Sequence, residues 1–349
     1  MSRVENWQPK AIVTGIACVA SVFVAEALHM PSNFLAPYVA FVSVNLGARD
    51  LRLILTANLF FMIAGFVLGA FAAEILLGRP VWQFLFIVVF SYLATLVRFG
   101  PINQFLAFAS FLFFWFAAYI VLISVYEPTS LYVIYWDFNF SVVIGVVCAW
   151  VAARLAIALG FKEPVRDSPA PLVEDREKEL HDAELIALVG ATAIAVALLL
   201  WVWFDLPAIT QIALTIALTV DRDIAVGFAR RRQRLIGCFF GGGVALLVIV
   251  LNPESYLLWL IVFFLVTYVS SAWQINEPER DYAGLQAATA FFLVLSGTEG
   301  ERGDIIGGVD RLAGIYIGIL LLMILRYPFI NIVFRLYYAA KSGAKSKPQ

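Results

Sequence analysis

Charged side chains occur inside long apolar segments of this chain, where they are costly. Asp310 and Arg311 stand side by side in the last such segment, and Asp137 lies at a similar point of an earlier one. A charge at the centre of a bilayer costs about 2.5–3.5 kcal/mol on insertion scales, so such residues usually face protein or water and are functional. An arginine can hold a carboxylate bidentately, and a desolvated aspartate can take up a proton. We therefore expect an anion-binding site with proton-coupling carboxylates.

Structural interpretations of the same residues stay open. Asp310 and Arg311 could pair with the acidic residues of 299–304 at the outer interface. Asp137 and Asp310 could be helix N-terminal charges that the helix dipole favours. The sequence alone does not separate these interpretations from transport.

Two Arg-Asp pairs mark a second candidate site, a mouth on the cytoplasmic side. They are Arg49-Asp50 and Arg222-Asp223, and we expect the arginines to meet the anion and the aspartates to assist proton movement. The alternative is that each pair anchors the topology. The cluster Arg230–Arg234 favours a role in membrane orientation and lipid headgroup contact over a binding site.

Three further features are weaker candidates. Glu26, late in the first apolar segment, is either a proton site or a solvated carboxylate near the outer face. Gln211 either lines the substrate cavity or forms a hydrogen bond between helices. The aromatic run Phe111–Phe116 could stack an aromatic substrate, although a core or lipid-facing helix is the usual role of such a run.

Composition places these residues in a polytopic membrane protein. Of the 349 residues, 62% are apolar and 14% are charged, against about 45–50% and 25% in soluble domains. The cysteines and histidines have no metal-ligand spacing, and we find no nucleotide-binding loop and no catalytic triad pattern. We therefore expect no enzyme activity, no metal, no cofactor and no nucleic-acid partner.

Apolar segments of suitable length predict an all-α fold of about 12 transmembrane helices, six in each half. The expected spans are 11–29, 32–47, 53–77, 81–97, 103–125, 136–160, 184–204, 207–220, 234–251, 255–272, 282–297 and 307–327. The expected domains are a first six-helix repeat (1–160), a cytoplasmic linker (161–182), a second repeat (183–335) and a basic cytoplasmic tail (336–349). With both termini in the cytoplasm, only Arg79 and Arg302 of the basic residues fall in outer loops, as the positive-inside rule requires.

The two halves are related by a shift of 173 residues. This shift aligns Arg49-Asp50 with Arg222-Asp223, and Asp137 with Asp310. Six spans per half make the repeats parallel and related by a pseudo-twofold axis along the membrane normal. The second span of each half is short and interrupted by proline, which in matched positions of two halves points to a transport site.

Small residues four positions apart predict where the helices pack closely, because lipid supplies no hydrophobic drive between helices. The expected packing residues are Gly65 and Gly69, Gly237 and Gly241, Ser141 and Gly145, and Gly314 and Gly318.

Arg231, Arg234, Gly237 and Gly241, preceded by a short proline-containing span, resemble the fusaric-acid-resistance-like family, which includes bacterial aromatic acid exporters. The segment that starts at Asp310-Arg311 resembles the closing helix of that family. The resemblance implies a multi-pass transporter of the bacterial inner membrane that exports aromatic or hydrophobic weak acids on the proton gradient. It also implies a periplasmic membrane fusion protein as partner. The short linker and the absence of an arginine row in the first half depart from the family pattern, so the substrate could differ.

The sequence therefore predicts an inner-membrane efflux transporter of organic, aromatic anions. Arg311, Arg222, Arg49 and Gln211 would bind the substrate, and Asp310, Asp137, Asp223, Asp50 and Glu26 would couple protons. A passive anion channel and a non-transporting envelope scaffold are the alternatives. The sequence also leaves a homo-oligomer open.

Overall fold

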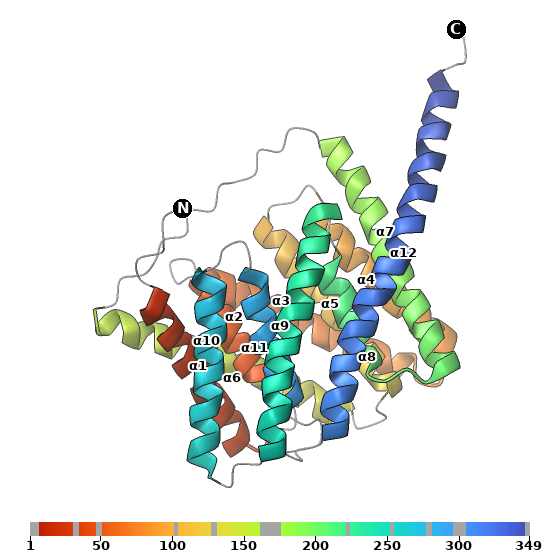
Figure 1. Cartoon of the computed structure of the whole chain (residues 1–349). Helices are drawn as coiled ribbons and strands as arrows, with labels where there is room; N and C mark the ends of the chain where they lie inside the picture. Colours follow the sequence, from red (N-terminus) through yellow and green to blue (C-terminus); the bar gives the residue numbers. More distant parts are fainter. Residues whose placement is uncertain are drawn as a thin grey trace.

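The computed structural model describes residues 7–30, 35–46, 51–100, 104–126, 131–160, 176–220, 224–251, 255–276, 281–295 and 305–345. This part of the chain is entirely helical and contains no strand (Figure 1). Its helices are α1 (Trp7–Ala27), α2 (Leu35–Leu46), α3 (Leu51–Ile75), α4 (Pro80–Phe99), α5 (Gln104–Tyr126), α6 (Leu131–Ala158), α7 (Arg176–Phe204), α8 (Ile209–Thr219), α9 (Ile224–Leu251), α10 (Tyr256–Asn276), α11 (Asp281–Leu295) and α12 (Ile305–Lys345).

Within the described residues, eight helices are long and apolar enough to cross a membrane. The chain is therefore a multi-pass membrane protein, as its composition predicts. The other four apolar helices contain shorter apolar segments among the described side chains, Leu35–Val44, Leu59–Ile75, Ile209–Thr219 and Asp281–Leu295, so the arrangement of about 12 spans stays a prediction. The 12 residues of α2 and the 11 of α8 reach about 18 Å at 1.5 Å per residue, against a hydrocarbon core of about 30 Å.

The short helix α8 begins directly after a tight turn at the end of α7. Asp205 and Ala208 both adopt positive φ angles of 49°, and Pro207 stands between them. Because proline cannot continue a helix from the preceding turn, α7 ends at Phe204 and α8 starts in a new direction. A residue with positive φ, His29 at 54°, likewise follows the end of α1.

Helix pairs recur between the first six helices and the last six. The pair α3 and α5 is in contact, as is the pair α9 and α11; α2 packs on α6, and α8 packs on α12. Between the two sets, α1 contacts α10 and α4 contacts α7. The short helices α2 and α8 thus lie inside the bundle, each held by a longer helix from its own set.

Glycines lie where helices approach most closely. A Cβ added at Gly69 would lie 2.8 Å from the carbonyl oxygen of Ala117 on α5, and one at Gly241 would overlap that of Ala287 on α11. Gly65 and Gly237 meet the same two helices one turn earlier. These contacts bring the backbones of α3 and α5, and of α9 and α11, together.

Three more small residues lie where the two short helices are packed. Gly145 of α6 meets the carbonyl oxygen of Ala36 on α2, and Gly314 and Gly318 of α12 meet α8. Ser141 is fully buried on the same helix as Gly145. The small residues chosen from the sequence therefore occupy helix contacts in the structure.

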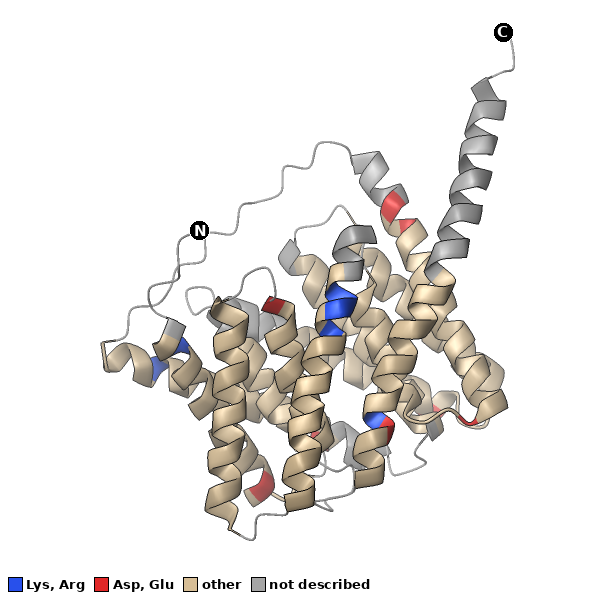
Figure 2. Ribbon diagram, viewed as in Figure 1, with Lys and Arg blue, Asp and Glu red and all other residues tan. Residues whose placement is uncertain are grey.

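Charged side chains of the described residues lie mostly near the helix ends, and long uncharged stretches separate them (Figure 2). Large apolar side chains are exposed along the outer helices, among them Phe71 on α3, Leu85 on α4 and Leu265 on α10. This pattern is typical of a helical bundle whose perimeter faces lipid tails.

Candidate substrate cavity

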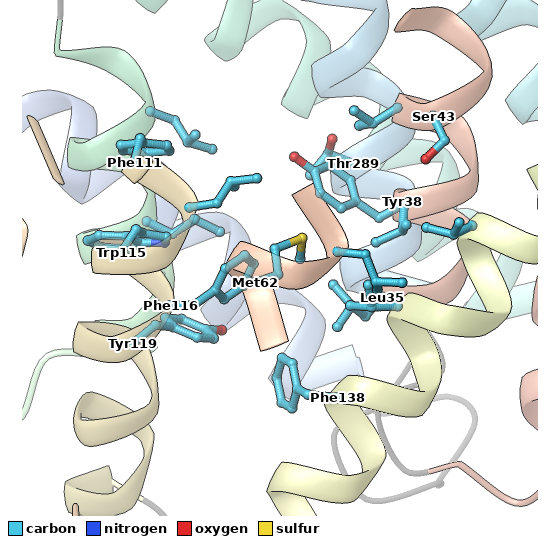
Figure 3. A pocket seen from close by; sticks show the side chains of 18 of the residues that line it. Leu35, Tyr38, Ser43, Met62, Phe111, Trp115, Phe116, Tyr119, Phe138 and Thr289 are labelled. Carbon is cyan, nitrogen blue, oxygen red and sulfur yellow. The ribbon is translucent and has the colours of Figure 1, made fainter. Parts of the chain in front are cut away.

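An apolar cavity of about 140 Å³ lies between α2, α3, α5 and α6 of the first half and α8 and α11 of the second. Aromatic rings form much of its wall, with the α5 rings opposite the α2 side chains (Figure 3). The aromatic lining residues are Tyr38, Phe108, Phe111, Trp115, Phe116, Tyr119 and Phe138. Aromatic side chains stack face to face or edge to face with a bound ring, so this wall suits a flat apolar ligand.

The size of the cavity limits what can bind. A cavity of about 150 Å³ lined by Leu, Ile and Phe is known to bind benzene, so this one has room for a single aromatic ring. The side-chain polar groups at its wall are the hydroxyls of Ser43, Thr289, Tyr38 and Tyr119 and the indole N–H of Trp115. The cavity wall itself carries no charged side chain among the described residues.

A buried arginine lies just beyond this cavity. Arg234 of α9 is 0% exposed, and its guanidinium contacts two other helices. Nη1 donates to Gln286 Oε1 at 2.5 Å and to Tyr282 Oη at 3.4 Å on α11. Nη2 donates to Thr215 Oγ1 at 3.0 Å on α8. The guanidinium therefore joins the three helices α8, α9 and α11.

Three neighbours place Arg234 close to the cavity. Gln286 precedes the lining residue Thr289 by three positions, so the two share one face of α11. Thr215 stands between Leu214 and Leu218, which both line the cavity. Tyr38 on α2, which also lines the cavity, is near enough to Arg234 for an electrostatic interaction.

A second arginine approaches the same face of α11 further along the helix. Arg311 Nη1 donates to the carbonyl oxygen of Leu293 at 2.6 Å, and Leu293 lines the cavity. Seven residues separate Gln286 from Leu293, about 10 Å along the helix axis. The two arginines therefore bracket the part of α11 that faces the cavity.

A third arginine, Arg98 at the end of α4, lies behind the cavity wall. Its guanidinium carbon is 5.1 Å from the ring centre of Phe111 and 5.1 Å from that of Phe99. Its Nη1 donates to the carbonyl oxygen of Ala217 at 2.9 Å. Because Phe111 lines the cavity, this cation–π contact fixes one of its aromatic walls.

The carboxylates chosen from the sequence differ in burial and in their distance along the chain from the cavity-lining residues. Asp137 is 5% exposed and directly precedes the lining residue Phe138 on α6. Asp310 is half-buried on α12, beside Arg311, and Glu26 is half-buried at the end of α1. Of these three carboxylates, Asp137 is the one whose sequence neighbour lines the cavity.

Gln211, chosen from the sequence as a substrate-binding residue, is buried on α8 but is not part of the cavity wall. Its Cβ lies 3.1 Å from the position of a Cβ added at Gly314, so it packs between α8 and α12. The Arg-Asp pairs Arg49-Asp50 and Arg222-Asp223 lie outside the described residues.

Sequence reasoning did not select Arg234 or the aromatic wall as the centre of a site. It placed Arg234 in an orientation cluster, whereas the side chain is fully buried between helices. The spacing of the sequence could have indicated this burial. Arg234 stands about one turn before Gly237 and two turns before Gly241, and both glycines pack on α11. It therefore lies on the packed face of α9, whereas Arg232 lies on an exposed face.

No group of three or more His, Cys, Asp or Glu side chains within the described ranges could hold a metal ion. The three cysteines Cys18, Cys148 and Cys238 are free thiols. The chemistry that these residues offer is thus reversible binding through aromatic contact, hydrogen bonds and charge.

Comparisons with curated proteins and with solved structures found no significant match to the chain. A family model, described as fusaric acid resistance protein-like, matches residues 193–325. The match runs from the middle of α7 into α12 and includes Arg234, Gln286 and Arg311. Over this second half the chain matches the fusaric acid resistance protein-like family, as the arginine and glycine spacing predicted.

Proposed function

We propose that this protein exports small aromatic carboxylic acids across the bacterial inner membrane. This proposal rests above all on the aromatic cavity between helices of both halves, with the buried Arg234 and the half-buried Arg311 at its margin. The family match and the membrane-spanning helices support a transporter-type protein. The apolar wall would hold the ring of the substrate, and a guanidinium would meet its carboxylate.

The proposal includes two parallel six-helix repeats. The recurring helix contacts support it, because α1 packs on α10 as α7 packs on α4, which is the exchange that a twofold relation produces. The matched glycine contacts of α3 with α5 and of α9 with α11 support it too. In this arrangement the cavity lies near the interface of the repeats, where alternating access would open it to either side.

Proton coupling is assigned to carboxylates at matched positions. Asp137 and Asp310 would bind protons from the periplasm, with Glu26, Asp50 and Asp223 as further proton sites. Arg311 would attract the anion on the outer side, and Arg222 and Arg49 would collect it on the cytoplasmic side. The burial of Asp137, next to the cavity-lining residue Phe138 in the chain, supports this role.

The proposal also includes a location and a partner. Both termini would lie in the cytoplasm, as the distribution of basic residues favours. A periplasmic membrane fusion protein would carry the exported acid onward. The protein would need no cofactor and catalyse no reaction.

Reconstitution into proteoliposomes tests this function. Vesicles containing the purified full chain are loaded with a pH-sensitive dye, and a proton gradient is imposed while radiolabelled benzoate flux is measured. We expect gradient-driven benzoate movement with stoichiometric proton flux, and its loss in the Asp310→Asn, Arg311→Ala variant. Wild-type flux in that variant at equal protein content would refute the assignment.

A passive anion channel is the second candidate, favoured by arginines placed at both ends of one face of α11. The same vesicles separate the two functions. A channel would carry benzoate current down its own gradient without any proton movement.

A further inference from the structure

The two halves carry opposite chemistry at equivalent places. Gly65 meets the carbonyl of Phe113, and Gly237 meets that of Ala283. Met62 stands three residues before Gly65, as Arg234 stands three before Gly237.

The helices that face these glycines, α5 and α11, show the same contrast between apolar and polar residues. Phe116 stands three residues after Phe113, as Gln286 stands three after Ala283. Met62 and Phe116 line the cavity, whereas Arg234 and Gln286 bond to each other. The apolar residues that the first half contributes to the cavity wall therefore correspond to a polar cluster in the second half.

The neighbouring helices show the same contrast. A Cβ added at Gly145 would lie 2.8 Å from the Cβ of Val39, and one added at Gly318 would lie 2.9 Å from the Cβ of Thr215. Phe138, seven residues before Gly145, lines the cavity. Its counterpart seven residues before Gly318 is Arg311, which bonds to a cavity-lining residue. At these matched positions the first half thus places Met62 and Phe138 in the cavity wall, and the second half has Arg234 and Arg311.

The partners of Arg234 within the described residues are all neutral: a phenol, an amide and a hydroxyl. Its Nε has no hydrogen-bond partner there. A guanidinium has five N–H donors, and Nε together with Nη2 forms the edge that binds a carboxylate through two bonds. Removing such a charge from water without a counter-charge is unfavourable, so the site is suited to receive an anion.

Resting on the proposed function, we infer that Arg234 is the carboxylate subsite of the substrate and that the substrate is a monocarboxylate with a single aromatic ring. The ring occupies the apolar cavity, against the aromatic residues of the first half, and the carboxylate extends toward Arg234 between α8 and α11. Tyr282, Gln286 and Thr215 keep the guanidinium in place without neutralising it. An amphipathic ligand therefore bridges the two halves, and a ligand that lacks either part loses affinity.

Equilibrium binding to the detergent-purified full chain tests this subsite. The probes are benzoate and its uncharged analogue benzamide, which share the ring and differ in charge. We expect wild-type protein to bind benzoate at least tenfold more tightly than benzamide, because hydrogen bonds between charged groups are the stronger ones. In Arg234→Gln the two affinities should become similar through a loss of benzoate affinity.

Arg232→Gln is the matched control, since Arg232 is exposed on the same helix and the change in charge is identical. It should bind benzoate as the wild type does. If Arg234→Gln is not monodisperse on size exclusion, Arg234→Lys keeps the charge but loses the two-donor edge, and it should still lose benzoate affinity severalfold. Wild-type benzoate affinity in a folded Arg234 variant overturns the subsite.

Failure of the proposed function gives a different result. If Val142→Phe, which fills the ring cavity, leaves both probes bound as in the wild type, the ring site is wrong. Loss of both probes in Val142→Phe with unchanged benzoate binding in Arg234→Gln would keep the cavity and reject the arginine.

Discussion

Arg311 donates a 2.6 Å hydrogen bond to the carbonyl oxygen of Leu293, and this bond ties α12 to the cavity-facing side of α11. Arg234 bonds to the same side about two turns earlier, through Gln286. Both guanidiniums reach α11 from neighbouring helices, one from α9 and one from α12. Two cations therefore hold the short helix α11, one at Gln286 and one at Leu293. The lining residue Thr289 lies between these two contacts, and Leu293 is itself a lining residue.

Removal of the Arg311 guanidinium should reduce transport by breaking the tie to Leu293. We expect Arg311→Met to lower benzoate flux in proteoliposomes at least tenfold, because an apolar side chain of similar length cannot attract the anion or donate to the carbonyl. Arg79→Met is the control, since Arg79 is an exposed arginine at the start of α4. Equal flux in both variants would show that neither the charge of Arg311 nor its bond to Leu293 is needed for transport.

A larger side chain in the cavity should block the substrate. Val142 lines the cavity and is 1% exposed, whereas its neighbour Val143 is 37% exposed on the outer face of α6. We expect Val142→Phe to abolish benzoate flux, at a cost in stability of about 1–3 kcal/mol for overpacking. Val143→Phe adds the same atoms toward lipid and should transport normally. Undiminished flux in folded Val142→Phe would mean that the substrate passes elsewhere.

The sequence predicted much of this fold because its dominant signal is apolar length. Each of the twelve expected segments overlaps one observed helix, and Gly237 and Gly241 occupy a helix contact of the kind that their spacing predicted. The prolines in the second span of each half predicted two short segments there, and α2 and α8 have 12 and 11 residues. What the sequence did not show is the backbone of the turn before α8, where Asp205 and Ala208 adopt positive φ angles.

The site was harder to predict for a physical reason. Phe111 and Trp115 are ordinary core or lipid-facing residues by type, and only the packing of six helices shows that they enclose a cavity. Arg234 looks like a topology arginine, because its burial depends on contacts with α8 and α11 that are remote in sequence. Sequence can therefore indicate the charges, but the tertiary fold decides which of them are desolvated.

Glycine at the contact of α9 with α11 should be required for stability. A Cβ at Gly241 would overlap the carbonyl of Ala287, whereas one at Gly243 would meet nothing within 4 Å. We expect Gly241→Ala to lower the melting temperature in detergent by several degrees, as overpacking costs about 1–3 kcal/mol. Gly243→Ala should be neutral or slightly stabilising, because alanine loses less backbone entropy in a helix. Equal melting temperatures would show that α9 and α11 can separate without cost.

Neutralisation of Asp137 should uncouple transport from the proton gradient. The side chain is 5% exposed and directly precedes Phe138 at the cavity wall, so its protonation would change the charge beside the substrate. We expect Asp137→Asn to move benzoate down its own gradient but to lose acceleration by an imposed pH difference, because asparagine cannot exchange a proton. Asp205→Asn, at an exposed position between α7 and α8, should keep the full response. If Asp137→Asn responds to the pH difference as the wild type does, the proton is carried by another carboxylate, and Asp310→Asn becomes the variant that should lose the response.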